Sequence, residues 1–318
     1  MCTVPQKTRG TAAENDRLIV EAMTRKPISW SNLDKGVFWW MLAMHTGALL
    51  APFFFSWSAI GAALVLHWLT ASVGICLGFH RYLSHRSLKL KTPSKFFVLL
   101  AGSLSAEGGP SRWAAVHRLH HAKSDKEGDP HSPRHGSMWA HLYWMFLDKC
   151  ERGEDAMMNK FGPDLTQDKM VTFFDRTFVL WALGLGAALY AIGGMQWLVW
   201  GLFVRTVFTY HSTWFVNSAT HLWGYRNYET RDDSRNNWWV ALLSYGEGWH
   251  NNHHAHPSMA PAGHRWWEID MTMWSVRFLQ FIGQAYDVRD RIPHAKAREA
   301  SLDENHEMPK EVALALSA

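Results

Sequence analysis

Histidines gather in three short boxes along the chain, and their spacing suits metal binding. HRLHH at 117–121 places histidines at i, i+3 and i+4, and HNNHH at 250–254 repeats that spacing. On a helix these positions share one face, so the imidazoles can converge on an ion. HRYLSH at 80–85 holds a further pair, and NSATH at 217–221 ends in another histidine. The candidate ligands are His80, His85, His117, His120, His121, His221, His250, His253 and His254.

This set exceeds what one ion can use, because a zinc site takes four ligands, or three and a water in an enzyme. The sequence therefore predicts two metal ions. Imidazole suits iron, zinc, copper and nickel, and neutral ligands leave the full cationic charge on the metals. No carboxylate lies inside the boxes, whereas a hydrolytic two-metal site would normally include one. The pattern favours oxidation of a substrate that has no polar group to hold.

Long apolar segments must position these boxes. Residues 37–56 and 58–79 contain no charge, and a second pair, 177–192 and 195–216, is split at Gly193-Gly194. About 20 apolar residues cross a hydrocarbon core. The segments predict an all-α integral membrane protein with four transmembrane helices in two hairpins; core helices of a soluble protein are the alternative. Arg205 is the one charge within them and should face protein or water.

The positive charges predict the orientation in the membrane. Six Lys and Arg precede residue 37, fifteen lie in 80–176 and ten follow residue 216. By the positive-inside tendency, both termini and all the histidine boxes are cytoplasmic. We expect a cytosolic N-terminal extension (1–33), a main domain (34–289) whose helical cap (80–176 and 217–289) holds the metal site, and a mobile tail (290–318).

Several classes of protein are excluded by composition. The three cysteines form no CxxC pair, which excludes a disulfide scaffold, a thiolate zinc finger and a cysteine-ligated cluster. The net charge of +4 is scattered, so no nucleic-acid partner is expected. Electrons for a redox reaction must then come from a separate protein.

The boxes HRYLSH, HRLHH and HNNHH, with NSATH between them, resemble the membrane-bound fatty acid desaturases, above all the cyanobacterial and bacterial delta-9 acyl-lipid enzymes. The likeness runs from about residue 34 to residue 286 and includes GGPSRW, DPHSP and GEGWHNNHHA. It implies a mushroom-shaped fold and two iron ions on the nine histidines, with Asn217 reaching one iron through a water. The implied reaction uses O2 and two external electrons to form a cis double bond in a saturated acyl chain.

Other residues have expected supporting roles. A ligating histidine usually donates its second N–H to a carboxylate or carbonyl, for which Asp129 and Glu247 are candidates and Glu107 a weaker one. Helix capping or surface ion pairing is the alternative for each. By similarity, Trp113, Thr213 and Trp214 shape the bend of a substrate tunnel, although ordinary core packing explains them too.

The residues before the second box indicate which carrier holds the acyl chain, and the lack of cysteine ligands indicates a separate electron donor. Animal acyl-CoA enzymes carry polar and charged residues before the second box, whereas EGGPSRWAAV has Arg112 as its only cation. We therefore expect a lipid-linked fatty acyl substrate rather than acyl-CoA. The other expected partners are membrane lipids and a separate electron donor, either a ferredoxin or a cytochrome b5-like protein. The alternatives are an acyl-CoA delta-9 desaturase, an alkyl or carotenoid hydroxylase of the same superfamily, and a membrane haem cytochrome using His45, His67 and His211.

Overall fold

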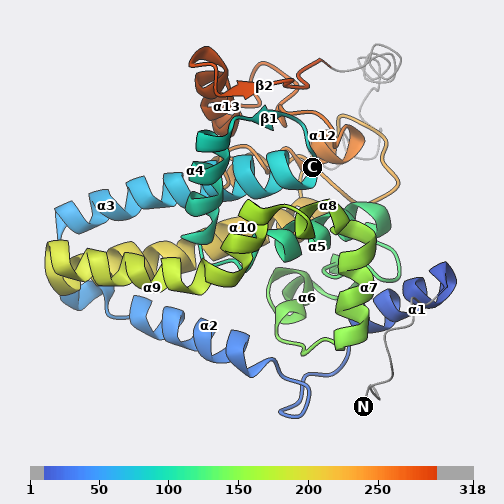
Figure 1. Cartoon of the computed structure of the whole chain (residues 1–318), viewed down its shortest axis with the longest axis horizontal. Helices are drawn as coiled ribbons and strands as arrows, with labels where there is room; N and C mark the ends of the chain where they lie inside the picture. The colour runs from blue at the N-terminus through green and yellow to red at the C-terminus, as the bar shows by residue number, and fades with distance from the viewer. Residues whose placement is uncertain (1–10, 292–318) are drawn as a thin grey trace, which may run out of the picture.

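The computed structural model describes residues 11–291, and this part of the chain is mostly helical (Figure 1). Its one small sheet pairs β1 (Lys89–Leu90) with β2 (Ala285–Tyr286) in antiparallel register. Long helices lie side by side at one end of the molecule, and shorter helices gather at the other.

The first long unit consists of four consecutive helices. Asp34 caps the first of them by accepting a hydrogen bond from the Val37 amide. Pro52 stands in a 3-10 turn that interrupts the apolar segment expected as one helix. The unit comprises α2 (Lys35–Ala48), the 3-10 helix η1 (Ala51–Phe54), α3 (Trp57–His67) and the π-helix η2 (Trp68–Ser84).

The second long unit reverses direction at Gly193-Gly194. Gly194 has φ +63° and ψ −154°, a conformation that is essentially restricted to glycine. Beyond this turn, Leu202 lies against Gly186 of the preceding helix, so the two arms pack together. The unit comprises α9 (Lys169–Leu198), the π-helix η5 (Val199–Val204) and α10 (Arg205–Leu222).

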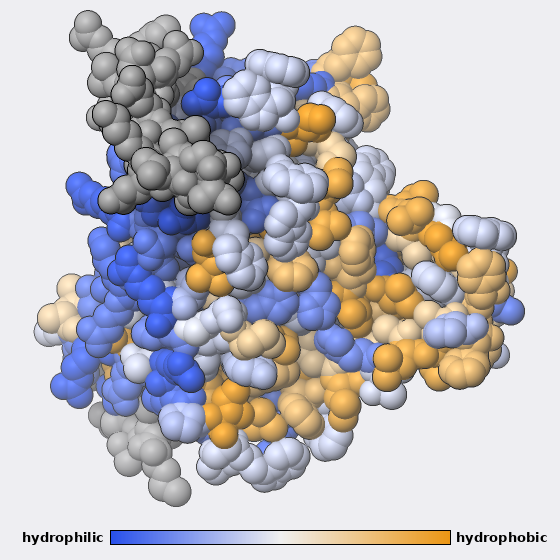
Figure 2. Space-filling view, turned by 180° about the vertical axis from the view of Figure 1, so that it is seen from behind, coloured by the Kyte–Doolittle hydropathy of each residue, from blue (hydrophilic) through white to orange (hydrophobic). Residues whose placement is uncertain are grey.

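Two stretches are long and apolar enough to cross a membrane, judged by length and composition: Trp57–Ser84 and Lys169–Leu222. Their outer surface carries exposed apolar side chains such as Leu64, Leu180 and Ile192. Figure 2 shows that the end of the molecule formed by the long helices is largely apolar and that the opposite end is hydrophilic. Contiguous apolar surface of this kind marks a membrane or protein contact.

Shorter helices build the hydrophilic end. They are α1 (Ala12–Met23), α4 (Thr92–Ser103), α5 (Pro110–Lys123), η3 (Pro133–His135), α6 (Ser137–His141), η4 (Tyr143–Met145), α7 (Glu151–Phe161), α8 (Pro163–Thr166), α11 (Trp238–Leu243), α12 (His250–Ala255) and α13 (Met271–Phe281).

The core of this end holds α5 in place. Leu119 is fully buried and packs with Ile19 and Met23 of α1, so residues 12–23 of the expected N-terminal extension belong to the folded core. Helix α4 packs closely against η2 at Gly74, because a Cβ added to Gly74 would lie only 2.4 Å from the Gly102 nitrogen. Most of the expected C-terminal tail, 292–318, lies outside the described residues.

Arg205 is buried at the start of α10. Its guanidinium donates to the backbone oxygens of Gly201 at 3.1 Å and Leu104 at 3.0 Å. Leu104 caps the C-terminus of α4, where the helix dipole favours a cation. The charge therefore faces protein, as expected.

Candidate metal centre

The first box lies on a π-helical turn. In a π-helix the N–H of a residue bonds the carbonyl five residues earlier, and the His85 amide donates to the His80 oxygen at 3.1 Å. The five-residue spacing therefore places both histidines on one side, with ring centroids 4.7 Å apart. This local geometry explains a spacing that an α-helix would splay apart.

The second and third boxes each serve two groups of histidines. On α5, His117 and His121 point to one group and His120 to the other. On α12, His253 joins the first group, and His250 and His254 join the second. The first cluster is His80, His85, His117, His121 and His253, and the second cluster is His120, His221, His250 and His254.

Within each cluster the Nε2 atoms converge. In the first cluster, the Nε2 of His85 lies 2.8 Å from that of His117, and the Nε2 of His253 lies 3.0 Å from that of His121. In the second cluster, α10 supplies His221, and its Nε2 lies 3.2 Å from that of His250. Nitrogens from helices far apart in sequence therefore surround two adjacent points.

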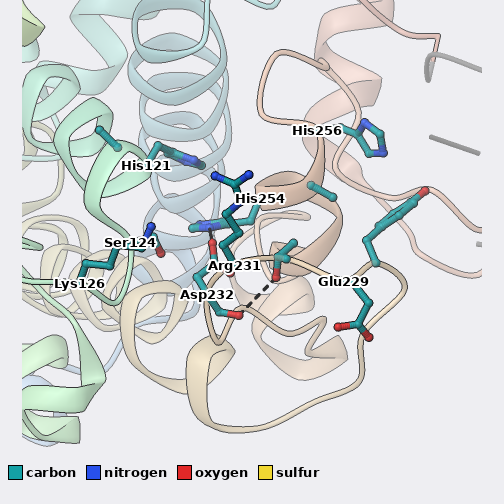
Figure 3. A pocket seen from close by; sticks show the side chains of 12 residues that line it. His121, Ser124, Lys126, Glu229, Arg231, Asp232, His254 and His256 are labelled. Atoms are coloured by element: carbon teal, nitrogen blue, oxygen red, sulfur yellow. Dashed lines mark hydrogen bonds and ion pairs between the residues drawn. The ribbon is translucent and has the colours of Figure 1, made fainter. Parts of the chain in front are cut away.

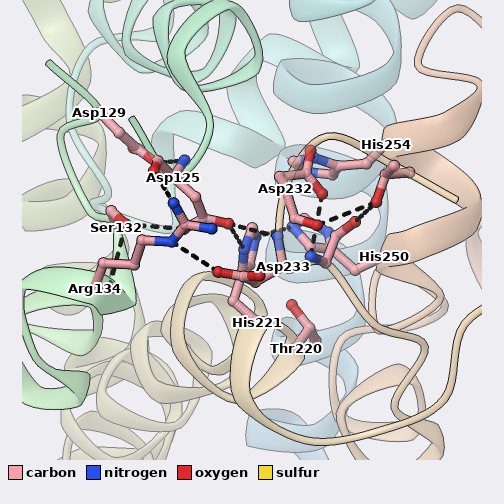
Figure 4. A network of polar contacts seen from close by, with 12 residues as sticks. Asp125, Asp129, Ser132, Arg134, Thr220, His221, Asp232, Asp233, His250 and His254 are labelled. Carbon is pink, nitrogen blue, oxygen red and sulfur yellow. Dashed lines mark hydrogen bonds and ion pairs between the residues drawn. The ribbon is translucent and has the colours of Figure 1, made fainter. Parts of the chain in front are cut away.

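Carboxylates contact the opposite nitrogen of four rings. The Nδ1–O distances are 2.8 Å for His80 with Glu247, 3.0 Å for His120 with Asp129, 2.8 Å for His221 with Asp125 and 2.8 Å for His254 with Asp232. Figure 4 shows the acids around the second cluster, which reach it from the loops after α5 and α10.

This arrangement fits metal binding. A neutral imidazole that donates Nδ1–H to a carboxylate has a bare lone pair on Nε2. The Nε2 atoms of His120 and His254 are buried and lack a hydrogen-bond partner among residues 11–291. Burial lowers the pKa of His117 and His121 well below the usual value, which keeps those rings neutral. Each cluster thus presents unprotonated nitrogen to its centre.

The carboxylates stay ionised despite burial. Desolvation alone would raise the pKa of Asp129, but His120 beside it holds that pKa at about 2. The pKa of Glu247 is likewise about 2, because Arg81 and His80 outweigh its desolvation. Anionic partners raise the basicity of a ligating imidazole and fix its orientation.

Arg81 is a second link between the first box and the third. It is 2% exposed and donates to both oxygens of Asp270 at 2.9 Å and to Glu247 at 2.8 and 3.1 Å. Asp270 in turn caps α13. The residue next to His80 therefore connects η2 to the segment that presents α12, which was not anticipated from the sequence.

The expected supporting acids divide into two groups. Asp129 and Glu247 contact histidines of the clusters, whereas Glu107 contacts none. Asp125 and Asp232 were missed. Asp125 follows His121 by four residues, which was a usable signal; Asp232 lies in a loop with no comparable cue.

A polar contact joins two of the expected tunnel residues. Glu107 accepts hydrogen bonds from Trp113 Nε1 at 3.1 Å and from Thr213 Oγ1 at 2.8 Å. The indole of Trp113 stacks on His117, with centroids 5.4 Å apart and planes at 23°. Trp214 instead packs on Tyr210, on a different side of α10. Trp113 and Thr213 thus form one wall beside the first cluster.

Other predicted residues lie outside the clusters. Asn217 stands on α10, one turn before His221. The Nε2 atoms of His45 and His211 lie 3.3 Å apart, which leaves no space for a haem between them. His67 contacts Thr209 at 3.1 Å. His131 adds an unexpected ring against His120, at 4.3 Å between centroids.

Comparison with known proteins places these observations in one family. The sequence model of the family described as fatty acid desaturase matches residues 54–277. An sn-2 palmitoyl-lipid 9-desaturase of Nostoc sp. (strain 36) is 46% identical over 77% of this chain and 86% of its own. An sn-1 stearoyl-lipid 9-desaturase of Anabaena variabilis is 41% identical over 86% and 98%. An acyl-CoA 5-desaturase of Anemone leveillei is 41% identical over 77% and 76%.

The match covers more than half of the chain and includes all three histidine boxes. The resemblance inferred from those boxes is therefore confirmed. The chain belongs to the fatty acid desaturase family and is an oxidoreductase.

Proposed function

We propose that the protein is a di-iron enzyme that uses O2 to introduce a cis double bond at position 9 of a lipid-linked saturated acyl chain. The observation that carries the proposal is the pair of adjacent histidine clusters. Two relatives named lipid 9-desaturases support both the position and the carrier. Arg112, the one cation in residues 107–116, pairs with Glu154 at 2.8 Å and so is not free for a CoA group.

The nine histidines would hold the two ions, with Asn217 reaching one through a water. Iron bound there supplies the activation of O2 that unactivated methylene groups require. The chain's own acids would fix four of these rings: Glu247, Asp129, Asp125 and Asp232 accept the Nδ1 protons and aim the Nε2 atoms inward.

The wall of Trp113 and Thr213 would border the acyl chain and exclude water from the reacting carbons. Glu107 holds both residues. Its burial raises its pKa to about 7, so it is far less charged than an exposed glutamate and suits an apolar channel. Trp214, the third expected tunnel residue, lies on the same helix as Thr213, where its ring stacks on Tyr210.

In the proposed topology, the four expected segments cross the membrane as two hairpins, and both termini and the clusters are cytoplasmic. The two long apolar stretches and their apolar outer surface support this arrangement. The Lys and Arg distribution supports the orientation. Electrons would come from a separate ferredoxin or cytochrome b5-like protein.

Expression in a host that lacks unsaturated fatty acids, with a supplied electron donor, tests the proposal. Mass spectrometry of derivatised lipids locates any double bond, and separate analysis of the acyl-CoA pool identifies the carrier. We expect delta-9 unsaturation in membrane lipids. Hydroxylated chains, or unsaturation appearing first in acyl-CoA, would contradict the proposal. His135→Ala, outside both clusters, is the matched control for ligand variants.

A further inference from the structure

A polar pocket opens where the two clusters approach the hydrophilic surface. Its volume is about 410 Å³, and its lining includes one histidine of each cluster, His121 and His254. Figure 3 shows both side chains among those that line the pocket. His121 is partly exposed, whereas the side chain of His254 is only 1% exposed. The pocket therefore borders a residue of each cluster, and His121 is the more accessible of the two.

Two cations at this pocket are unpaired in the part of the chain that the structure describes. Lys126 and Arg231 are exposed and line it, and neither forms an ion pair within residues 11–291. Nearby Arg134 and Arg226, in contrast, both contact Asp233. Figure 3 shows the Arg231 side chain among the residues that line the pocket with His121 and His254. Cations that remain unpaired beside such a site are available to an anionic partner.

Two further features support an anionic partner. Ser124 lines the pocket and is 6% exposed, and its Oγ has no hydrogen-bond partner among the described residues. Asp232 is already engaged with His254, and the carboxylate of Glu229 points away from the Arg231 guanidinium (Figure 3). Most of the lining side chains are polar or charged, so the pocket does not suit an acyl chain, which would border Trp113 instead.

We propose that this pocket is the docking site of a small acidic one-electron carrier protein, whose carboxylates pair with Lys126 and Arg231. The inference rests on the proposed function. One turnover oxidises two carriers by one electron each. Those electrons, two hydrogens from the acyl chain and two solvent protons reduce one O2 to two waters. Docking here brings the carrier's redox centre close to both clusters, by way of His121 and His254.

Charge reversal tests the docking site. The variants are Lys126→Glu, Arg231→Glu and their combination in full-length protein in detergent, with an acidic [2Fe–2S] ferredoxin and an acidic cytochrome b5 as separate probes. Calorimetry with oxidised carrier gives the Kd, and turnover assays give the KM for reduced carrier. Both are measured over a range of salt concentrations. We expect the double variant to raise Kd and KM at least about tenfold at low salt, with the difference shrinking as salt increases.

Two matched variants complete the design. Glu229→Gln removes the one exposed acid of the lining and should lower Kd about two- to threefold by relieving repulsion of the carrier. Lys26→Glu reverses an exposed lysine outside the pocket and should leave Kd unchanged. The iron content of every variant is measured, so that weaker binding is compared only between equally loaded proteins.

The outcomes separate this inference from the proposed function. If wild-type protein reduced chemically with dithionite forms no double bond, the proposed function fails. If it does form one, but charge reversal leaves Kd and its salt dependence unchanged for both carriers, the docking site is wrong. Equal weakening by Lys26→Glu would also overturn it, because the effect would then reflect net charge rather than this pocket.

Discussion

The two histidine clusters differ in how their ligands are held. The first has five imidazoles, of which only His80 contacts a carboxylate within residues 11–291. The second has four, and three of them, His120, His221 and His254, each contact one. Regular helical spacing orients the first cluster, whereas acids from loops orient the second. Because an acid on Nδ1 strengthens a ligand, the second cluster should depend on its acids more than the first does.

Removing a ligand from either cluster should have the largest effect. His253→Ala in the first cluster and His250→Ala in the second should each lower desaturation by more than about 100-fold, more than loss of an outer partner does. Each variant should retain about one iron per chain by mass spectrometry. Full activity in His253→Ala, with His135→Ala as control, would refute the metal assignment.

Glu247→Gln should affect both metal binding and folding. It removes the carboxylate from His80 and one of two acids from buried Arg81. We expect iron affinity at the first cluster to fall about 10- to 100-fold and the free energy of unfolding to fall by up to about 3 kcal/mol. Chelator titration and thermal unfolding measure the two effects. A change in only one of them would show that Glu247 does not connect the ligand to the Arg81 network.

Asp125→Asn should weaken the second cluster alone. The amide cannot stabilise the His221 tautomer as the carboxylate does, so iron affinity should fall about 10- to 100-fold at that cluster. Dialysis against a chelator should then remove one iron before the other. Asp233→Asn, which alters a neighbouring acid that pairs with Arg134 instead of a histidine, is the control. Simultaneous loss of both irons would contradict independent support of the clusters.

Glu107→Gln should give a smaller, pH-dependent effect. Glu107 forms no ion pair with any described residue, and burial raises its pKa from 4.5 to about 7. The folded protein therefore holds a proton that the unfolded chain releases, and this stabilisation is present below pH 4.5 and lost as the pH rises to about 7. The free energy of unfolding of the Gln variant should equal that of the wild type at low pH and exceed it at pH 8, by at most about 3 kcal/mol. A pH-independent difference in melting temperature would contradict this.

The sequence predicted that these histidines gather, because their spacing is local. Helical spacing brings His117 and His121 together, and His250 and His254 likewise. The reversal at Gly193-Gly194 was also visible, since only glycine tolerates the Gly194 conformation. Local rules of this kind do not require the tertiary structure.

The assignment of ligands to each ion was not predictable. His120 and His121 are adjacent in sequence and serve different clusters, because the helix turns by about 100° per residue and the partners come from other elements. Asp232 reaches His254 from a loop whose course depends on the packed structure. The π-helix at 68–84 could not be read from periodicity either, although it explains the five-residue spacing of His80 and His85.

Anomalous diffraction at the iron edge from crystals of the full chain tests the two-cluster site most directly. We predict two peaks, one surrounded by the Nε2 atoms of the first cluster and one by those of the second, with no carboxylate oxygen bound directly. In His250→Ala crystals the second peak should weaken or vanish while the first remains. A single peak, or a peak ligated by Asp129 or Asp125, would contradict the two-cluster structure.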